Sequence, residues 1–474
     1  MAQGAQARDV PQATLSWHAC DGHFRCARLP VPLNYAQPNG TQIHLAVIEL
    51  PSTSAHPVAD LVMNPGGPGG SGVQFLEQTS FPKALRAKFN LVSFDPRGVG
   101  ESDPVRCVNA AGLRKLIAMN PAPTTKAQVS QVVAATKAFV AACKANTSRA
   151  LLQHVSTSAT ANDLDRLRAA LGERKLTYLG FSYGTFLGEL YASRFPTHVR
   201  AMVLDGVVDP ALSTTTSDLQ QAQGFETDLA DFFAWCPTNA TCHRELPQGA
   251  RTAYDALFGR LVRGQDIVAL LRPRFGGTQE VTIGVAEVAL AGALYSKQTW
   301  PDLARALAQG LQGNGGLLAA LAYSYEGLQP NGSFSNEVAA NVAISCVDRP
   351  SPTKLSTYER LSDQMAKAAP DFGAAEAWGS LTCAYWPVAP QGKVGPLHAK
   401  GAPTILLVGS TGDPATPYRW AQAVAHQLDH SVLLTRRGPG HTGFFFSTCI
   451  QRYVERYLTN LSLPPAHTTC ATNH

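Results

Sequence analysis

Several common sequence signals are missing from this chain of 474 residues, and each absence removes a class of function. No apolar run approaches the length that crosses a bilayer, so we expect no membrane span. The net charge is only +5 and the basic residues form no stripe, which argues against nucleic-acid binding. The motif H-E-x-x-H and paired C-x2-C zinc ligands are both absent, so we expect no metal and no organic cofactor.

The ten cysteines are the most telling part of the composition. An even number without zinc-like spacing indicates disulfides and an oxidising compartment. Sequence neighbours suggest a pairing, which the sequence alone does not prove: Cys20 with Cys26, Cys107 with Cys143, Cys236 with Cys242, Cys346 with Cys383, and Cys449 with Cys470. Met1–Ala7 has the small, polar character of a mature N-terminus with an added methionine. We therefore expect a secreted or periplasmic protein whose signal peptide has been removed; the alternative is a cytoplasmic protein with reduced thiols.

Short apolar runs alternate with amphipathic stretches over much of the chain. After a polar lead, we expect strands at residues 42–50, 60–63, 90–94, 176–179, 199–204, 404–408 and 431–435. Helical patterns at 128–145 and 158–171 separate some of them. This alternation is typical of an α/β fold with a mostly parallel, doubly wound sheet.

The alternation stops in the middle of the chain, where helical patterns predominate. They cover residues 218–235, 249–262, 284–294 and 300–312, with Gly and Pro breaks between them. We interpret residues 210–400 as a helical cap inserted into a core made of residues 1–209 and 401–474. A chain of this length exceeds a usual single core, which agrees with an insertion.

Residues 180–184, Gly-Phe-Ser-Tyr-Gly, carry the strongest chemical signal. They follow an apolar run and precede a helical stretch, which is the setting of a nucleophile elbow. In that sharp turn the hydroxyl of Ser182 is exposed above the sheet, so Ser182 is the candidate nucleophile. The alternative is a tight turn with an ordinary surface serine.

A serine alcohol needs a neutral imidazole to take its proton and a carboxylate to orient that imidazole. Asp413 follows the penultimate expected strand, and His441 follows the last one. The order Ser182, Asp413, His441, each at the carboxyl end of a strand, is the order of an α/β-hydrolase triad. Taken singly, an Asp before Pro is more often a turn former, and the combination carries the prediction.

The oxyanion of acyl transfer needs backbone N–H donors, each typically contributing about 2.7 to 4 kcal/mol. We expect Tyr183 to supply one donor and Gly67, in the glycine-rich loop 64–72, to supply the other. That loop lacks the Lys-Ser/Thr of a P-loop and the spacing of a dinucleotide site, which argues against phosphate binding. The turn at 95–102 is expected to tie the loop in place, with Arg97 as its anchor.

Together these motifs resemble the prolyl iminopeptidase and tripeptidyl aminopeptidase family of α/β-hydrolase serine peptidases. The resemblance rests on residues 64–70, 95–102, 180–184, 412–414 and 440–442. Residues 346–348, 383–387 and 461–470 resemble the secreted tripeptidyl aminopeptidase branch. Simpler iminopeptidases carry His-Gly-Gly-Pro where residues 64–68 read Asn-Pro-Gly-Gly-Pro, so a shift of the second oxyanion donor by one residue stays open.

The resemblance implies a serine aminopeptidase that releases tripeptides from peptides with a free N-terminus. An acidic cap residue would then hold the substrate's α-ammonium group. Glu226 is our candidate, with Asp228, Asp231, Glu326 and Glu337 as rivals. The alternatives are an esterase or amidase of small molecules, a proline iminopeptidase that releases one residue, and a non-enzymatic protein that keeps the fold. The oligomeric state stays open.

Overall fold

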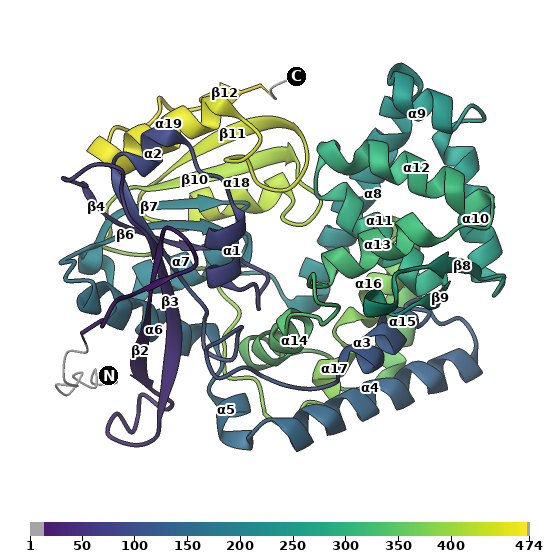
Figure 1. Ribbon diagram of the computed structural model, residues 1–474, viewed down its shortest axis with the longest axis horizontal. Helices are drawn as coiled ribbons and strands as arrows, with labels where there is room; N and C mark the ends of the chain where they lie inside the picture. Colours follow the sequence, from purple (N-terminus) through teal and green to yellow (C-terminus); the bar gives the residue numbers. More distant parts are fainter. Residues whose placement is uncertain (1–13, 472–474) are drawn as a thin grey trace.

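The central element of the computed structural model, which describes residues 14–471, is a ten-stranded sheet. Met1–Ala7 lies outside the described residues. The strand order is β1-β2-β3-β5-β4-β6-β7-β10-β11-β12. Strands from β5 to β12 pair in parallel, and β1, β2 and β3 join antiparallel at one edge. The expected mostly parallel α/β sheet is confirmed (Figure 1).

The strands are β1 (His18–Cys20), β2 (Phe24–Pro32), β3 (Gln42–Leu50), β4 (Ala59–Asn64), β5 (Phe89–Phe94), β6 (Leu176–Phe181), β7 (Val199–Asp205), β10 (Ile405–Gly412), β11 (Ser431–Pro439) and β12 (Thr469–Cys470).

The first part of the chain is not the polar lead that the sequence suggested. It contains β2, which pairs along its whole length with β3, from Arg25 opposite Glu49 to Pro32 opposite Gln42. Exposed and buried residues alternate over the first part of β2, as in a strand with one face covered. Because of that alternation the segment contains several polar residues, and it therefore lacks the apolar run by which a strand is recognised in the sequence. The central strand β6 is buried throughout, and such a strand reads as a continuous apolar run.

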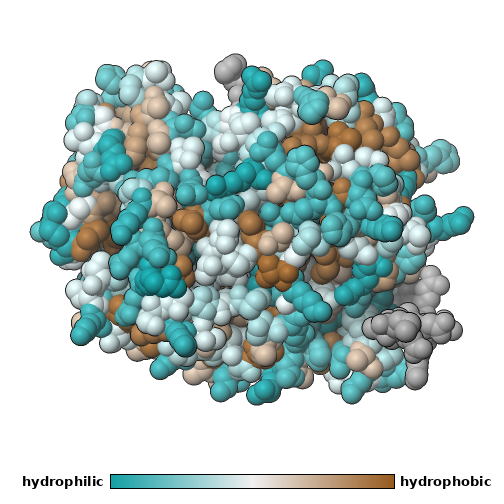
Figure 2. All heavy atoms as spheres, turned by 180° about the vertical axis from the view of Figure 1, so that it is seen from behind, coloured by the Kyte–Doolittle hydropathy of each residue, from teal (hydrophilic) through white to brown (hydrophobic). Residues whose placement is uncertain are grey.

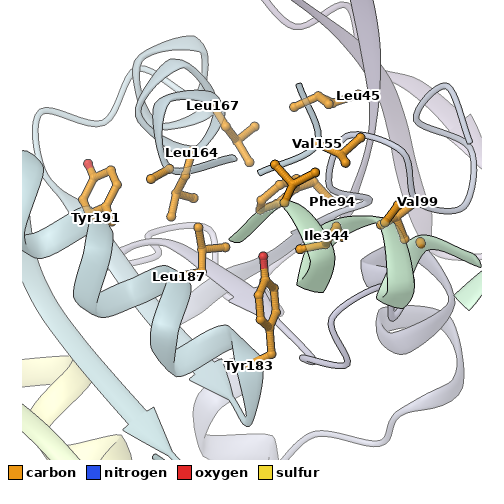
Figure 3. Packing of buried hydrophobic residues seen from close by; sticks show 14 of the residues in the cluster. Leu45, Phe94, Val99, Val155, Leu164, Leu167, Tyr183, Leu187, Tyr191 and Ile344 are labelled. Atoms are coloured by element: carbon orange, nitrogen blue, oxygen red, sulfur yellow. The ribbon is translucent and has the colours of Figure 1, made fainter. Parts of the chain in front are cut away.

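Helices cover both faces of the sheet. One face carries α6 (Thr157–Ala170), α7 (Tyr183–Arg194) and α18 (Tyr418–Gln427), and the other carries α1 (Gly72–Gln78), α2 (Lys83–Arg86) and α19 (Thr448–Asn460). Figure 3 shows the first layer, where Leu164 and Leu187 pack around Phe94 of β5. Burial on both faces makes the sheet a rigid base for the loops at its carboxyl edge.

Between β7 and β10 the chain leaves the sheet and builds a largely helical layer with its own core. The four expected helices are present as α8 (Thr214–Trp235), α10 (Ala250–Val262), α11 (Ile283–Leu294) and α12 (Trp300–Leu311). A small hairpin of β8 (Ile267–Leu270) and β9 (Thr278–Val281) was not expected. The remaining helices are α9 (Ala240–Glu245), α13 (Gly316–Tyr325), α14 (Glu337–Asp348), α15 (Leu355–Ala368), α16 (Gly373–Gly379) and α17 (Leu381–Ala384). The boundaries at 209/210 and 400/401 stay a prediction.

The cap also receives helices from an earlier part of the chain. Leu113 and Ile117 of α3 (Ala110–Ile117) lie in the cap's hydrophobic core. The long helix α4 (Lys126–Asn146) runs beneath the cap in Figure 1. Its first half packs beside α15 and α16, and its second half joins the main core. In return, Ile344 of the cap helix α14 is buried in the main core (Figure 3). The cap is therefore fastened to the core at several points.

Five disulfides join the ten cysteines: Cys20–Cys26, Cys107–Cys143, Cys236–Cys242, Cys346–Cys383 and Cys449–Cys470. This is the pairing of sequence neighbours. None of the helices within residues 14–471 is long and apolar enough to cross a membrane. On the face drawn in Figure 2, hydrophobic residues gather in patches among hydrophilic ones.

Candidate active site

Ser182 occupies the turn between β6 and α7. Its backbone has φ 53° and ψ −125°, a conformation that a residue with a side chain adopts only under strain. Glycine is required on both sides of the turn. A Cβ on Gly180 would lie 2.4 Å from the carbonyl oxygen of Gly184, and one on Gly184 would lie 2.7 Å from that of Asn64. The pentapeptide therefore forms the strand, sharp turn and helix that the elbow prediction requires.

Asp413 and His441 meet at the carboxyl edge of the sheet, after β10 and β11. Nδ1 of His441 donates to Asp413 at 2.8 Å from Oδ1 and 3.0 Å from Oδ2. The same carboxylate accepts the backbone N–H groups of Ala415, Thr416 and Thr442 at 2.8–3.1 Å. These bonds fix the carboxylate, and the carboxylate fixes the tautomer and orientation of the imidazole.

The loop that carries His441 is also held by groups outside the predicted triad. The backbone N–H of His441 donates to the backbone carbonyl of Tyr295, in the cap, at 2.9 Å, and the Tyr295 ring stands edge-on to the imidazole at 5.2 Å between centroids. Asp205, at the end of β7, accepts the N–H groups of Gly443 and Phe444, both at 2.8 Å. Core and cap therefore both position the loop that carries His441.

Burial by itself lowers the pKa of His441, but the charge and hydrogen bond of Asp413, assisted by the charge of Asp205, raise it above its usual value. Asp205 is fully buried, and burial raises its own pKa to about 7 in spite of its two backbone donors. A base with a raised pKa takes a proton more readily. The opposite ring atom, Nε2 of His441, is buried and has no hydrogen-bond partner within residues 14–471.

Two cavities meet at Ser182. One, of about 360 Å³, reaches from Tyr183 toward α8 and α16. The other, of about 520 Å³, contains His441 and reaches toward the end of α13 and the start of α14. The two share a few lining residues: Gly67, Ser182, Tyr295, Asn341 and Val342. We call them the Tyr183 cavity and the His441 cavity. The serine is thus reached from two directions under the cap.

The glycine-rich loop lies against the elbow. A Cβ on Gly66 would lie 2.9 Å from Cβ of Ser182 and 3.2 Å from the Tyr183 nitrogen, so only glycine permits this approach. The N–H of Gly66 donates to Oδ1 of Asn64 at 3.1 Å. No hydrogen bond from the N–H of Gly67 is found in the described part of the chain, and Gly67 lines both cavities. This arrangement favours Gly67 over Gly66 as the second oxyanion donor.

The turn at 95–102 ties the glycine-rich loop in place, although through a different residue than we expected. Asp95 accepts the Ser71 hydroxyl at 2.6 Å and the Val73 N–H at 3.1 Å. Arg97 instead points into the core and forms a buried ion pair with Asp163 of α6, at 2.6 and 2.7 Å. A fully buried guanidinium requires such a partner. Arg97 therefore fastens the turn to α6, and Asp95 fastens the loop to the turn.

Comparisons with known proteins show which family the chain belongs to. Residues 61–261 match the family described as alpha/beta hydrolase fold, and residues 369–470 match the one described as TAP-like protein. Serine protease Hip1 of Mycobacterium tuberculosis is 38% identical over 459 residues, which cover 95% of this chain and 88% of that protein. Tripeptidyl aminopeptidase of Streptomyces coelicolor is 32% identical over 479 residues, which cover 97% of this chain and 86% of that protein. The chain belongs to the tripeptidyl aminopeptidase-like α/β-hydrolases. It is a serine peptidase. Carboxylesterase B of Mycobacterium tuberculosis is also similar. It is 35% identical over 480 residues, which cover 96% of this chain and 90% of that protein.

In this peptidase the predicted ammonium contact, Glu226, is not among the residues that line either cavity. Its carboxylate accepts the backbone N–H of Asp371 at 2.9 Å, which joins α8 to the segment before α16. Five other carboxylates line the cavities: Asp218, Asp348 and Glu376 in the Tyr183 cavity, and the two rivals Glu326 and Glu337 in the His441 cavity. The structure thus brings acidic residues to Ser182, although not the one that we preferred.

Sequence reasoning missed Asp205, Tyr295 and a buried network behind the elbow. In that network Thr157 bonds to both the Tyr183 hydroxyl and Asp348. Asp205 had a recognisable signal, because it is an acidic residue at the carboxyl end of a buried strand. Tyr295 and Asp348 had none, because their place depends on how the cap folds over the sheet.

Proposed function

We propose that this serine peptidase releases tripeptides from the free N-termini of peptides through an acyl-enzyme. The observation that carries the proposal is the strained Ser182, which is reached by two cavities and lines one of them together with His441 of the buried Asp413–His441 pair. Nε2 of His441 takes the Ser182 proton while Oγ attacks the scissile carbonyl. His441 then gives that proton to the leaving amine as the peptide bond breaks. His441 then takes a proton from water as the water oxygen attacks the ester carbonyl, and it returns that proton to Oγ as the ester bond breaks, which frees the N-terminal fragment as a carboxylic acid and restores Ser182.

The oxyanion formed in both steps would accept hydrogen bonds from the N–H groups of Tyr183 and Gly67. Tyr183 is the first residue of α7, so its N–H has no partner within the helix and lies at the positive end of the helix dipole. No hydrogen bond from the N–H of Gly67 is found within residues 14–471, whereas the N–H of the neighbouring Gly66 donates to Asn64. Two such donors, fixed before the substrate arrives, stabilise the developing charge without reorganisation.

The position of His441 distinguishes the two cavities. Its proton goes to the leaving amine, so the peptide that follows the scissile bond begins in the His441 cavity. The N-terminal fragment then occupies the Tyr183 cavity, where Asp218 of α8 and Glu376 of α16 lie. Burial raises the pKa of Glu376 to about 7, and no hydrogen bond to its carboxylate is found among residues 14–471. We assign Glu376, with Asp218 beside it, as the acidic contact for the substrate's α-ammonium group.

The proposal is tested with chromogenic peptides of one, two and three residues, each with a free and an acetylated N-terminus. We expect the free tripeptide to be hydrolysed fastest and acetylation to abolish its turnover. If the single-residue substrate is preferred, the protein is an iminopeptidase-type enzyme. Equal rates for free and acetylated substrates would remove the ammonium site from the proposal.

The similarity to Carboxylesterase B supports a second candidate, an esterase of small acyl substrates. The same triad cleaves esters and amides, so the fold does not decide between them. A simple acyl ester added to the peptide set decides: turnover of the ester alone would replace the peptidase proposal. The five disulfides support secretion into an oxidising compartment.

A further inference from the structure

The His441 cavity contains two carboxylates that have no counter-charge within the described part of the chain. Glu326 directly follows α13, and Glu337 is the first residue of α14. No ion pair or hydrogen bond to either carboxylate is found within residues 14–471. Burial raises the pKa of both, and the charge of Glu337 contributes to raising that of Glu326 to about 7. Among residues 14–471, no positive side chain offsets either shift. Placing two acidic groups together without a cation is costly, and a cationic ligand would relieve that cost.

The Tyr183 cavity differs on this point. Its wall contains Arg349, whose positive charge opposes the raised pKa of Asp218 and that of Asp348. Asp348 is also bonded to the N–H and hydroxyl of Thr157. Arg349 does not offset the raised pKa of Glu376 in this cavity, but Glu376 shares the cavity with a cation, whereas the lining of the His441 cavity contains Glu326 and Glu337 and no Lys or Arg.

Glu337 lies close to the reacting centre, and Glu326 lines the same cavity. A Cβ on Gly67, the proposed oxyanion donor, would lie 3.5 Å from Oε1 of Glu337. His441, the proton donor to the leaving amine, lines the same cavity; its side chain is 9% exposed, and its Nε2 is unpartnered. Because Asp413 occupies Nδ1, the unpartnered edge of the ring is the one that serves the leaving amine. The residue that begins the leaving peptide would therefore enter the cavity that these carboxylates line.

We propose that Glu326 and Glu337 make the enzyme selective for peptides in which lysine or arginine directly follows the scissile bond. The proposal rests on the proposed function, because it takes the His441 cavity as the leaving-group side. A long cationic side chain spans from the backbone near His441 to a carboxylate on the cavity wall. The ion pair would form away from bulk water, where it is worth more than on the surface.

The test compares peptides made of three alanines followed by lysine, glutamine or glutamate and then by a common tail, all with a free N-terminus. Release of the tripeptide is measured by mass spectrometry, and kcat/KM is compared between substrates. We expect the order lysine, glutamine, glutamate, with lysine favoured over glutamine by about tenfold. Equal rates for the three substrates would overturn the selectivity and leave the peptidase proposal intact. If none of the three is cleaved, the proposed function fails, and this inference fails with it.

Variants show whether these two residues are responsible. Glu326→Gln and Glu337→Gln should each lower the ratio of lysine to glutamine rates, and Glu337→Lys should reverse the order so that glutamate is preferred. Glu359→Gln removes the same charge from an exposed position of α15 outside both cavities, so its ratio should match that of the wild type. If Glu337→Gln instead removes the requirement for a free N-terminus, the pair binds the α-ammonium group, and the proposal is wrong. The ranking in the wild type tests the proposal even if a variant does not fold.

Discussion

The carboxylates of the sheet edge and those of the cap are held in opposite ways. Asp413 accepts three backbone N–H groups and the imidazole, and Asp205 accepts two backbone N–H groups. In the cap, Glu326, Glu337 and Glu376 line the cavities without a hydrogen bond from any residue in the 14–471 range. A carboxylate whose two oxygens both accept hydrogen bonds from the backbone fixes a geometry, whereas one without partners is ready to bind a cation. The core is therefore organised for the reaction and the cap for choosing the substrate.

Loss of the nucleophile should have the largest effect on activity. Ser182→Ala removes the attacking oxygen, and we expect kcat to fall by about 10⁴-fold or more while the fold is retained. Hydrolysis of a free tripeptide substrate measures this, and a fluorophosphonate should label the wild type at Ser182. Ser356→Ala, an exposed serine of α15, is the matched control and should keep full activity. Peptidase activity in the Ser182 variant would place the nucleophile elsewhere.

Part of this site could be predicted from the sequence because it depends on short-range constraints. The glycines at 180 and 184 are required by contacts within the elbow and with Asn64, so the pentapeptide alone indicates the turn. Asp413 and His441 follow recognisable apolar strands, and parallel strands place their carboxyl ends at one edge. The sheet was predictable for the same reason, except for β2, whose half-exposed pattern concealed it.

The cap residues could not be assigned in this way. Glu226 and Asp218 lie about two turns apart on the same helix, and nothing local shows which of them faces Ser182. That choice depends on the packing of α8 against α16 and of α3 into the cap core. The charge of a side chain is visible in the sequence, but its counter-charge is a property of the fold.

Asp205 tests whether the core carboxylates work by holding geometry. Asp205→Asn would direct an amide toward one of the two N–H donors of Gly443 and Phe444, so the His441 loop should shift. We expect kcat to fall by about 10- to 100-fold. The charge of Asp205 is one of the causes that raise the pKa of His441, so the acid limb of kcat/KM against pH should also move to lower pH. A drop in melting temperature with an unmoved acid limb would reduce Asp205 to a structural role.

Glu376 tests the corresponding idea for the cap. Glu376→Gln removes a carboxylate from the proposed ammonium site, so KM for free tripeptides should rise by about tenfold with kcat changed much less. Burial raises the pKa of Glu376 to about 7. Protonation below that pH removes its charge, so KM of the wild type should rise as pH falls through about 7. The variant should lack this dependence, and equal KM values for the two proteins at pH 8 would contradict the assignment.

The same variant should have a small effect of opposite sign on stability. The folded protein raises the pKa of Glu376 from 4.5 to about 7, so it binds the proton more tightly than the unfolded chain does. The resulting stability is present below pH 4.5 and is lost as pH rises through about 7, where the buried carboxylate must be charged. Glu376→Gln carries no such charge and also relieves Glu287, whose raised pKa of about 8 is due to burial and then to Glu376. We expect the variant to exceed the wild type in unfolding free energy by about 1 kcal/mol at pH 8, with the gain vanishing near pH 4.5.

Urea unfolding at pH 8 and at pH 4.5 measures this difference, with Glu359→Gln as the control. A variant that is less stable at pH 8 would mean that the carboxylate is already paired in the free protein.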